Sequence, residues 1–194
     1  MVASLKDFPR HYYSLEEYFA LEKVSDARFE YWDGDIICRS GGTPGKYLLT
    51  SNIHCVLTNN LSDRKDRAYT GCLPIHTPKF PPYRYPDASV VCGDAKYKNF
   101  NGIHALENPT LLVEVLSATT EHADKNQKRL AYQAIKSLQE YMLIAQDEAH
   151  VTHYLRQGDF WNIKDYREMA AVITLPSINA EITLAEIYRG VSFE

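Results

Sequence analysis

One carboxylate stands inside a strongly apolar run. Glu114 follows Thr110-Leu-Leu-Val113 and precedes Val115 and Leu116, and continuous hydrophobicity of this kind is typical of a strand that is covered on both faces. An ionised carboxylate in such a strand is costly unless it is paired or binds a metal. We interpret Glu114 as a functional carboxylate. The alternative is a structural salt bridge or a strand end that opens to water.

A second carboxylate, Asp87, follows Pro86 at the start of another predicted strand over residues 85–92. A Pro-Asp step alone commonly just begins a turn or a strand. Asp87 becomes a candidate metal ligand because the next predicted strand, 110–116, carries Glu114. Two neighbouring strands could bring both carboxylates to one cation. Hard oxygen ligands suit Mg²⁺ or Mn²⁺.

The third candidate lies on a predicted helix over residues 121–138. The apolar residues that would face the core recur at helical spacing: Ala131, Ile135 and Leu138. Extending this stripe toward the N-terminus reaches Lys128 and then Asp124, and Tyr132 lies one turn after Lys128. We expect Lys128 to point at the sheet and to meet a carboxylate or a phosphate. The alternative is that it reaches solvent along the first turn of the helix.

The elements that must position these residues follow from periodicity and turn signals. Ser14 and Glu17 form a capping-box pattern, and Asp33-Gly34 is a hairpin turn signal. We predict helices over 15–21, 46–61 and 184–188, a hairpin over 29–38, strands over 68–75 and 141–144, a polar loop over 96–109, and three β-segments that end near residue 175. This order predicts one α/β domain over residues 1–194, with a central mixed sheet flanked by helices.

Composition limits the class of protein. Of the 194 residues, 45% are apolar and 24% are charged. These values are typical of a globular protein that folds without disulfides or structural metal ions. We find no leader-like or membrane-spanning run, so we expect a cytoplasmic protein. Four scattered cysteines predict free, buried thiols. The net charge of -4 weighs against tight binding of duplex DNA, because proteins that bind phosphate backbones usually carry a basic excess.

Together these motifs resemble the Uma-type family of putative restriction endonucleases, within the PD-(D/E)xK nuclease superfamily. The matching segments span nearly the whole chain: Phe29-Glu30-Tyr31 with Asp33-Gly34, Pro86-Asp87, Glu114 to Ser117, Asp124 with Lys128 and Tyr132, and Glu140-Tyr141. The resemblance implies a restriction endonuclease-like core. The superfamily's usual lysine, two residues after the glutamate, would fall on Leu116, so the resemblance implies that Lys128 replaces it.

The resemblance also implies a site and a reaction. Asp87, Glu114 and the Val115 carbonyl would hold Mg²⁺ or Mn²⁺, and Lys128 would act with them in hydrolysing phosphodiester bonds, with DNA as the expected substrate. Accessory roles would fall to Glu30, Asp124 and Tyr132. Glu30 could bind a second metal or a water, or it could simply be a polar surface residue of the hairpin. Contacts with the phosphate backbone would come from basic residues on the helix and on the loop after the Asp87 strand: Lys96, Lys98, Lys125, Arg129 and Lys136. The alternative for each of them is ordinary solvated surface. The sequence leaves the oligomeric state open; a homodimer would suit this activity, since nucleases that cut both strands often work as two-fold dimers.

Two other functions fit the same residues. The first is a non-catalytic module of the same fold that binds nucleic acid or a protein partner. It is favoured by the acidic net charge and by the absence of a lysine two residues after Glu114. The second is a metal-dependent hydrolase of small phosphorylated compounds, which would need no basic surface.

Overall fold

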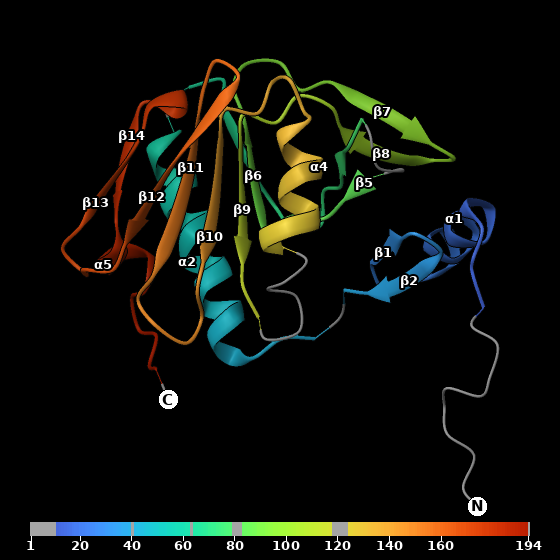
Figure 1. The fold of residues 1–194 in the computed structure, drawn as a ribbon, viewed down its shortest axis with the longest axis horizontal. Helices are drawn as coiled ribbons and strands as arrows, with labels where there is room; N and C mark the ends of the chain where they lie inside the picture. Colours follow the sequence, from blue (N-terminus) through green and yellow to red (C-terminus); the bar gives the residue numbers. More distant parts are fainter. Residues whose placement is uncertain (1–10, 40, 63, 79–82, 118–123, 194) are drawn as a thin grey trace, which may run out of the picture.

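A six-stranded mixed sheet forms the centre of the computed structural model, which describes residues 11–39, 41–62, 64–78, 83–117 and 124–193 (Figure 1). The strand order is β12-β11-β10-β9-β6-β3, and all neighbours are antiparallel except β9 and β10. The strands are β3 (Arg67–Thr70), β6 (Ala88–Val91), β9 (Leu111–Val115), β10 (Glu140–Ile144), β11 (Val151–Gln157) and β12 (Phe160–Tyr166). The predicted fold class, an α/β protein with a central mixed sheet, is confirmed.

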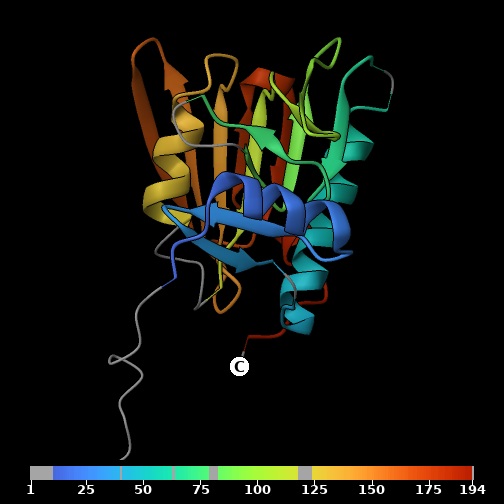
Figure 2. The same ribbon diagram turned by 90° about the vertical axis from the view of Figure 1, so that its right-hand side faces the viewer.

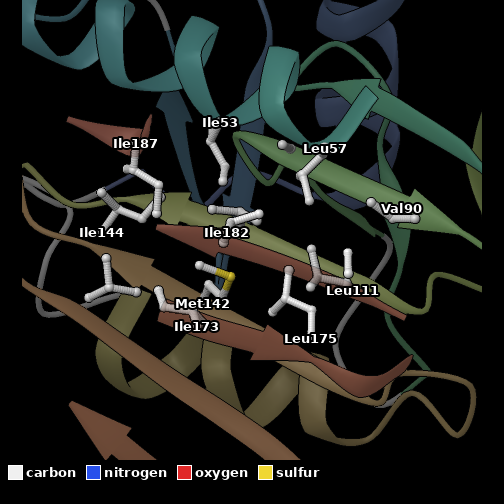
Figure 3. Close-up of a cluster of buried hydrophobic side chains, with 14 of the residues drawn as sticks. Ile53, Leu57, Val90, Leu111, Met142, Ile144, Ile173, Leu175, Ile182 and Ile187 are labelled. Carbon is white, nitrogen blue, oxygen red and sulfur yellow. The ribbon is translucent and has the colours of Figure 1, made fainter. Parts of the chain in front are cut away.

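One face of this sheet is covered by α2 (Pro44–Asn60) and by the β13 (Val172–Leu175) and β14 (Ala180–Thr183) hairpin with α5 (Leu184–Ile187). Figure 3 shows the apolar side chains that meet there, among them Ile53 and Leu57 of α2 and Ile182 of β14. Strand β14 was not among the predicted β-segments. The helix α2 begins where the Thr43 hydroxyl accepts a hydrogen bond from the Lys46 amide, 3.1 Å away.

The opposite face is covered by a π-helical turn, η2 (Asp124–Lys128), followed by α4 (Arg129–Gln133). The expected helix over 121–138 is therefore wrong at its C-terminal end, since the chain turns after Gln133; its first residues, 121–123, lie outside the described part of the chain. The predicted stripe does face the core, because Ala131, Ile135 and Leu138 are buried. A π-turn is rare and occurs frequently at functional sites.

The N-terminal elements form a separate layer. Helix α1 (Leu15–Val24) begins with the predicted capping box, and β1 (Phe29–Trp32) pairs with β2 (Asp35–Cys38) across the predicted Asp33-Gly34 turn. Both predictions are confirmed. Figure 2 shows this hairpin lying in front of the sheet, between α4 on one side and α2 on the other.

A small four-stranded sheet, ordered β5-β4-β8-β7, covers the remaining flank. Its strands are β4 (Ile75–His76), β5 (Tyr83–Arg84), β7 (Tyr97–Phe100) and β8 (Ile103–Leu106). The expected polar loop over 96–109 is thus wrong, because it contains the β7–β8 hairpin. Asn101 and Gly102 have φ angles of 51° and 97°, as the tight hairpin turns favoured by Asn-Gly require. The predicted 68–75 strand is likewise split between β3 and β4.

The cysteines are free but are not buried as expected. Cys38, Cys55 and Cys72 are exposed and Cys92 is half-buried. Within the described residues, no helix is long and apolar enough to cross a membrane.

Candidate metal centre

Glu114 lies in the middle of β9 and its side chain is inaccessible to solvent. Alternation along the strand turns it toward α4, on the same side as Leu112. One carboxylate oxygen, Oε1, accepts hydrogen bonds from the Lys128 ammonium and from the Tyr132 hydroxyl, each at 3.0 Å. The other oxygen, Oε2, accepts none from the described residues. The strand therefore holds a buried carboxylate with one oxygen hydrogen-bonded, while the other has the Arg39 guanidinium 3.9 Å away.

The Lys128 side chain points into the protein, as its stripe position predicted, and is 1% exposed. Its ammonium lies 3.0 Å from Glu114 Oε1, 3.0 Å from Asp124 Oδ1 and 3.4 Å from Glu30 Oε1. Each of these carboxylates comes from a different element, so Lys128 ties β9, η2 and the β1–β2 hairpin together. The inward lysine meets carboxylates rather than solvent.

Asp87 lies at the entrance to β6, beside the C-terminal end of β9. Its amide donates to the Val113 carbonyl at 2.9 Å, and its Oδ2 accepts a hydrogen bond from the Val115 amide at 2.7 Å. Gly71 packs against this segment, where an added Cβ would lie 3.0 Å from the Pro86 carbonyl oxygen. Backbone contacts therefore fix Asp87 next to the strand that carries Glu114.

Glu30 is also part of the cluster. Its Oε1 accepts a hydrogen bond from the Tyr85 amide at 2.9 Å, and the side chain is 2% exposed. The residue was expected to bind a second metal or a water, or simply to be polar surface of the hairpin. The structure buries Glu30 beside Lys128, so the interpretation as a surface residue of the hairpin is wrong.

Three further cations belong to the site, and none was assigned a role from the sequence. The Arg39 guanidinium lies 3.3 Å from Asp87 Oδ1 and 3.9 Å from Glu114 Oε2. The Lys46 ammonium lies 2.9 Å from the Val115 carbonyl oxygen and 3.3 Å from Asp87 Oδ2.

Arg84 is buried, with its guanidinium 3.9 Å from the centre of the Trp32 ring. Arg39 and Lys46 flank the Gly41-Gly42 segment that leads into α2. In the sequence they are marked only by their position between the hairpin and α2. Their contacts with the acids become visible only in the structure.

Formal charges in the cluster balance. Four carboxylates face four cations: Glu30, Asp87, Glu114 and Asp124 against Arg39, Lys46, Arg84 and Lys128. Buried charges of one sign are costly unless they are compensated. With Glu114 ionised, this balance allows the fold to hold so many ionisable groups in its interior.

Compensation is uneven among the acids. Burial raises the pKa of Glu114 to about 8, and the positive charges of Lys128 and Arg39 offset this only in part. Burial also acts to raise the pKa of Glu30, but Lys128, Arg39 and Arg84 outweigh it and the pKa is lowered. Burial would lower the pKa of Lys128, yet the surrounding carboxylates raise it. Ionised Glu114 is thus the least compensated of these groups, and a further cation near it would be favourable.

A cavity of about 560 Å³ opens onto the cluster, within the size range of small-molecule sites. Its wall includes charged residues of β1, η2 and α2 and of the segments that follow β2 and precede β6: Glu30, Arg39, Lys46, Asp87, Asp124 and Lys128. Trp32 and Tyr47 also line it. The site is therefore a polar cavity with aromatic walls.

The donor types fit a hard divalent cation. Asp87, Glu114 and the Val115 carbonyl offer oxygen atoms only, which Mg²⁺ and Mn²⁺ prefer, and Glu114 Oε2 is a buried oxygen without a hydrogen-bond donor in the described residues. In the same part of the chain, no three His, Cys, Asp or Glu side chains are arranged as a ready-made ligand set. The cationic side chains of Arg39 and Lys46 lie near these oxygens.

The expected DNA-contacting residues do not line the cavity. Lys96 and Lys98 are exposed at the β7–β8 hairpin, and Lys98 Nζ lies 3.4 Å from a ring nitrogen of His76. Lys125 and Arg129 each follow a cavity-lining residue of η2 and are half-buried. The second pair is therefore next to the site, and the first pair belongs to another element.

The chain is similar to a protein family and to proteins of cyanobacteria. A model of the Uma2 family, described as "Putative restriction endonuclease", matches residues 15–186. An uncharacterized protein of Synechocystis sp. is 34% identical over 143 residues, which are 74% of this chain and 80% of that protein. A second uncharacterized Synechocystis protein is 29% identical over 194 residues, the full length of both.

A crystal structure described as a putative nuclease belonging to DUF820, from Anabaena variabilis, superimposes with a TM-score of 0.70. The match covers 91% of this chain and 97% of that one at 22% identity. At this identity the likeness establishes a shared fold.

Proposed function

The chain belongs to the Uma2 family, and we propose that it is a metal-dependent endonuclease that hydrolyses phosphodiester bonds in DNA. The observation that carries the proposal is the buried Glu114, whose Oε1 is held by Lys128 and Tyr132 while Oε2 accepts no hydrogen bond from the described residues. A cation could therefore bind at Oε2, where the Arg39 guanidinium lies 3.9 Å away, beyond hydrogen-bond distance.

We assign the metal ligands to Asp87, Glu114 and the Val115 carbonyl. A bound Mg²⁺ or Mn²⁺ would supply a water of lowered pKa and would polarise the phosphate. Asp87 is fixed for this role by the hydrogen bond from the Val115 amide. Lys128 and Tyr132 orient Glu114 through its other oxygen, and Glu30 and Asp124 compensate the Lys128 charge.

Lys128 is thus proposed chiefly as a positioning residue. A direct contact between its ammonium and the substrate would require it to leave one of three carboxylates that lie within 3.4 Å. Because Lys128 also lines the cavity, its charge still acts on a phosphate bound there.

DNA contacts are assigned first to Lys125 and Arg129, which adjoin the cavity along η2 and α4. Lys96 and Lys98 would extend the contact only if the duplex also passes the β7–β8 hairpin. The net charge of -4 means that any basic path is local. A two-fold dimer would present two such sites to the two strands.

The test is cleavage of plasmid DNA in the presence of Mn²⁺, compared between the wild-type protein and Asp87→Asn. Asn keeps an oxygen that can accept the Val115 hydrogen bond but removes the charge. Cleavage by the wild type that is lost in the variant supports the proposal. Equal cleavage by both proteins contradicts the assigned site.

A second candidate function is a non-catalytic module of the same fold. The observation in its favour is that Arg39 and Lys46 already compensate Asp87, so the charges balance without a metal. Calorimetric titration with Mn²⁺ separates the two: binding that is lost in Glu114→Ala favours the enzyme, and no binding by the wild type favours the module.

A further inference from the structure

Lys46 occupies an unusual position for a lysine. It lies in the first turn of α2, where the exposed amides and the helix dipole favour negative charge, and that turn contains no acidic residue. The side chain is only 14% exposed. A cation is therefore held at the unfavourable end of a helix, and something outside the helix must stabilise it.

That stabilisation comes from two oxygens. The Lys46 ammonium lies 2.9 Å from the Val115 carbonyl oxygen and 3.3 Å from Asp87 Oδ2. These are two of the three ligands assigned to the metal above. The ammonium therefore occupies a position whose oxygen neighbours also suit a metal cation. A divalent ion could not bind both oxygens while the ammonium remains there.

We propose that Lys46 is the resident cation of this metal site, holding Asp87 and the Val115 carbonyl in place until a divalent ion displaces it. The inference rests on the proposed function, since it concerns the same ligands. Lys46 lines the cavity of about 560 Å³, so its flexible side chain has room to leave the ligands without unfolding α2. Once displaced, its ammonium faces the space where a substrate phosphate would lie.

Arg39 does not fit this role. Its guanidinium contacts Asp87, but Glu30 and Glu114 also hold it, at 3.8 and 3.9 Å. It is an anchored bridge among three acids, and it leaves the Val115 carbonyl untouched. Lys46 contacts only ligand oxygens, so displacing it breaks no other salt bridge described in the structure.

Calorimetric titration with Mn²⁺, without DNA, tests the inference in the full-length wild type and in Lys46→Met. If the lysine competes, the variant binds Mn²⁺ about ten-fold more tightly, because wild-type affinity is reduced by the fraction of sites that the ammonium occupies. Lys46→Gln should shift in the same direction, and its amide can still donate to the Val115 carbonyl if Met disturbs the fold. Lys65→Met, on an exposed lysine beyond the opposite end of α2, should bind as the wild type does.

Thermal unfolding gives a second readout. Without metal, Lys46→Met should unfold at a lower temperature than the wild type, and Mn²⁺ should raise its unfolding temperature by the larger increment. Equal or weaker Mn²⁺ binding by both Lys46 variants, with clear binding by the wild type, overturns the inference and leaves the proposed function standing. No binding by any of the proteins overturns both.

Discussion

The ammonium nitrogen of Lys128 lies 3.0 Å from Oε1 of Glu114, and both side chains are buried. The strand β9 and the turn η2 that carry them are separated in the chain by residues 116–123, so the pair joins the sheet to the helix that covers it. Two further carboxylates share the same ammonium. Lys128 is accordingly the common counter-ion of the cluster.

Removing this counter-ion should destabilise the fold. Lys128→Met leaves three buried carboxylates without their shared cation, and breaking a buried ion pair from one side typically costs about 3–5 kcal/mol. Urea unfolding followed by circular dichroism measures the loss. Lys136→Met, on an exposed lysine just beyond α4, should change stability by less than about 0.5 kcal/mol. A similarly small effect of Lys128→Met would contradict the counter-ion role.

The pKa of Glu114 makes a prediction about pH. Its folded-state value of about 8 lies above the ordinary 4.5, so the folded protein binds a proton that the unfolded chain has released. This contribution to stability is complete below the ordinary value and is lost as pH rises through about 8. The metal-free wild type should therefore lose stability between about pH 5 and about pH 8.

Glu114→Gln should lack this contribution, because Gln does not titrate. The pKa of Glu30 is lowered instead, so its contribution is present above the ordinary value and is lost only as pH falls below it. Urea midpoints across the same pH range, compared between the two proteins, isolate Glu114. Parallel pH profiles would show that Glu114 is ionised in both folded and unfolded states.

Loss of a ligand charge should weaken metal binding strongly. Asp87→Asn should weaken Mn²⁺ binding by more than the roughly 10- to 100-fold that is typical of losing an outer partner of a ligand, and cleavage should fall with it. Calorimetry and plasmid cleavage give the two values. If Asp87→Asn binds Mn²⁺ with wild-type affinity, Asp87 is not a metal ligand.

DNA affinity should depend on the two basic pairs unequally. Replacing Lys125 and Arg129 by Gln should reduce the salt dependence of binding by about two units in the slope of log K against log salt, one for each lost phosphate contact. Replacing Lys96 and Lys98 should change it less, because the β7–β8 hairpin does not line the cavity. Fluorescence anisotropy at several salt concentrations measures both. A larger effect from the hairpin pair would place the DNA elsewhere.

Sequence alone predicted the parts of the site that depend on local pattern. Glu114 was identifiable because an acid interrupts an apolar strand, and Lys128 because it continues the stripe of Ala131 and Ile135. Burial of these residues follows directly from periodicity. The β1–β2 hairpin and its turn were equally local, and they too were correctly predicted.

The parts that were missed depend on distant segments. Arg39 and Lys46 are ordinary polar residues of a loop and a helix start, and only the approach of α2 to the end of β9 gives them their partners. The β7–β8 hairpin did have a local signal, Asn101-Gly102, but its strands are only four residues long, too short to show a clear alternation. Tertiary packing, rather than pattern, decided these cases.

The most direct test of the metal centre is a crystal structure of the protein soaked in Mn²⁺, with the ion located by its anomalous scattering. We expect one ion bound by Asp87, Glu114 Oε2 and the Val115 carbonyl, with the Lys46 ammonium moved into the cavity. A map with no ion at these oxygens, and with Lys46 still bonded to Val115, would contradict it.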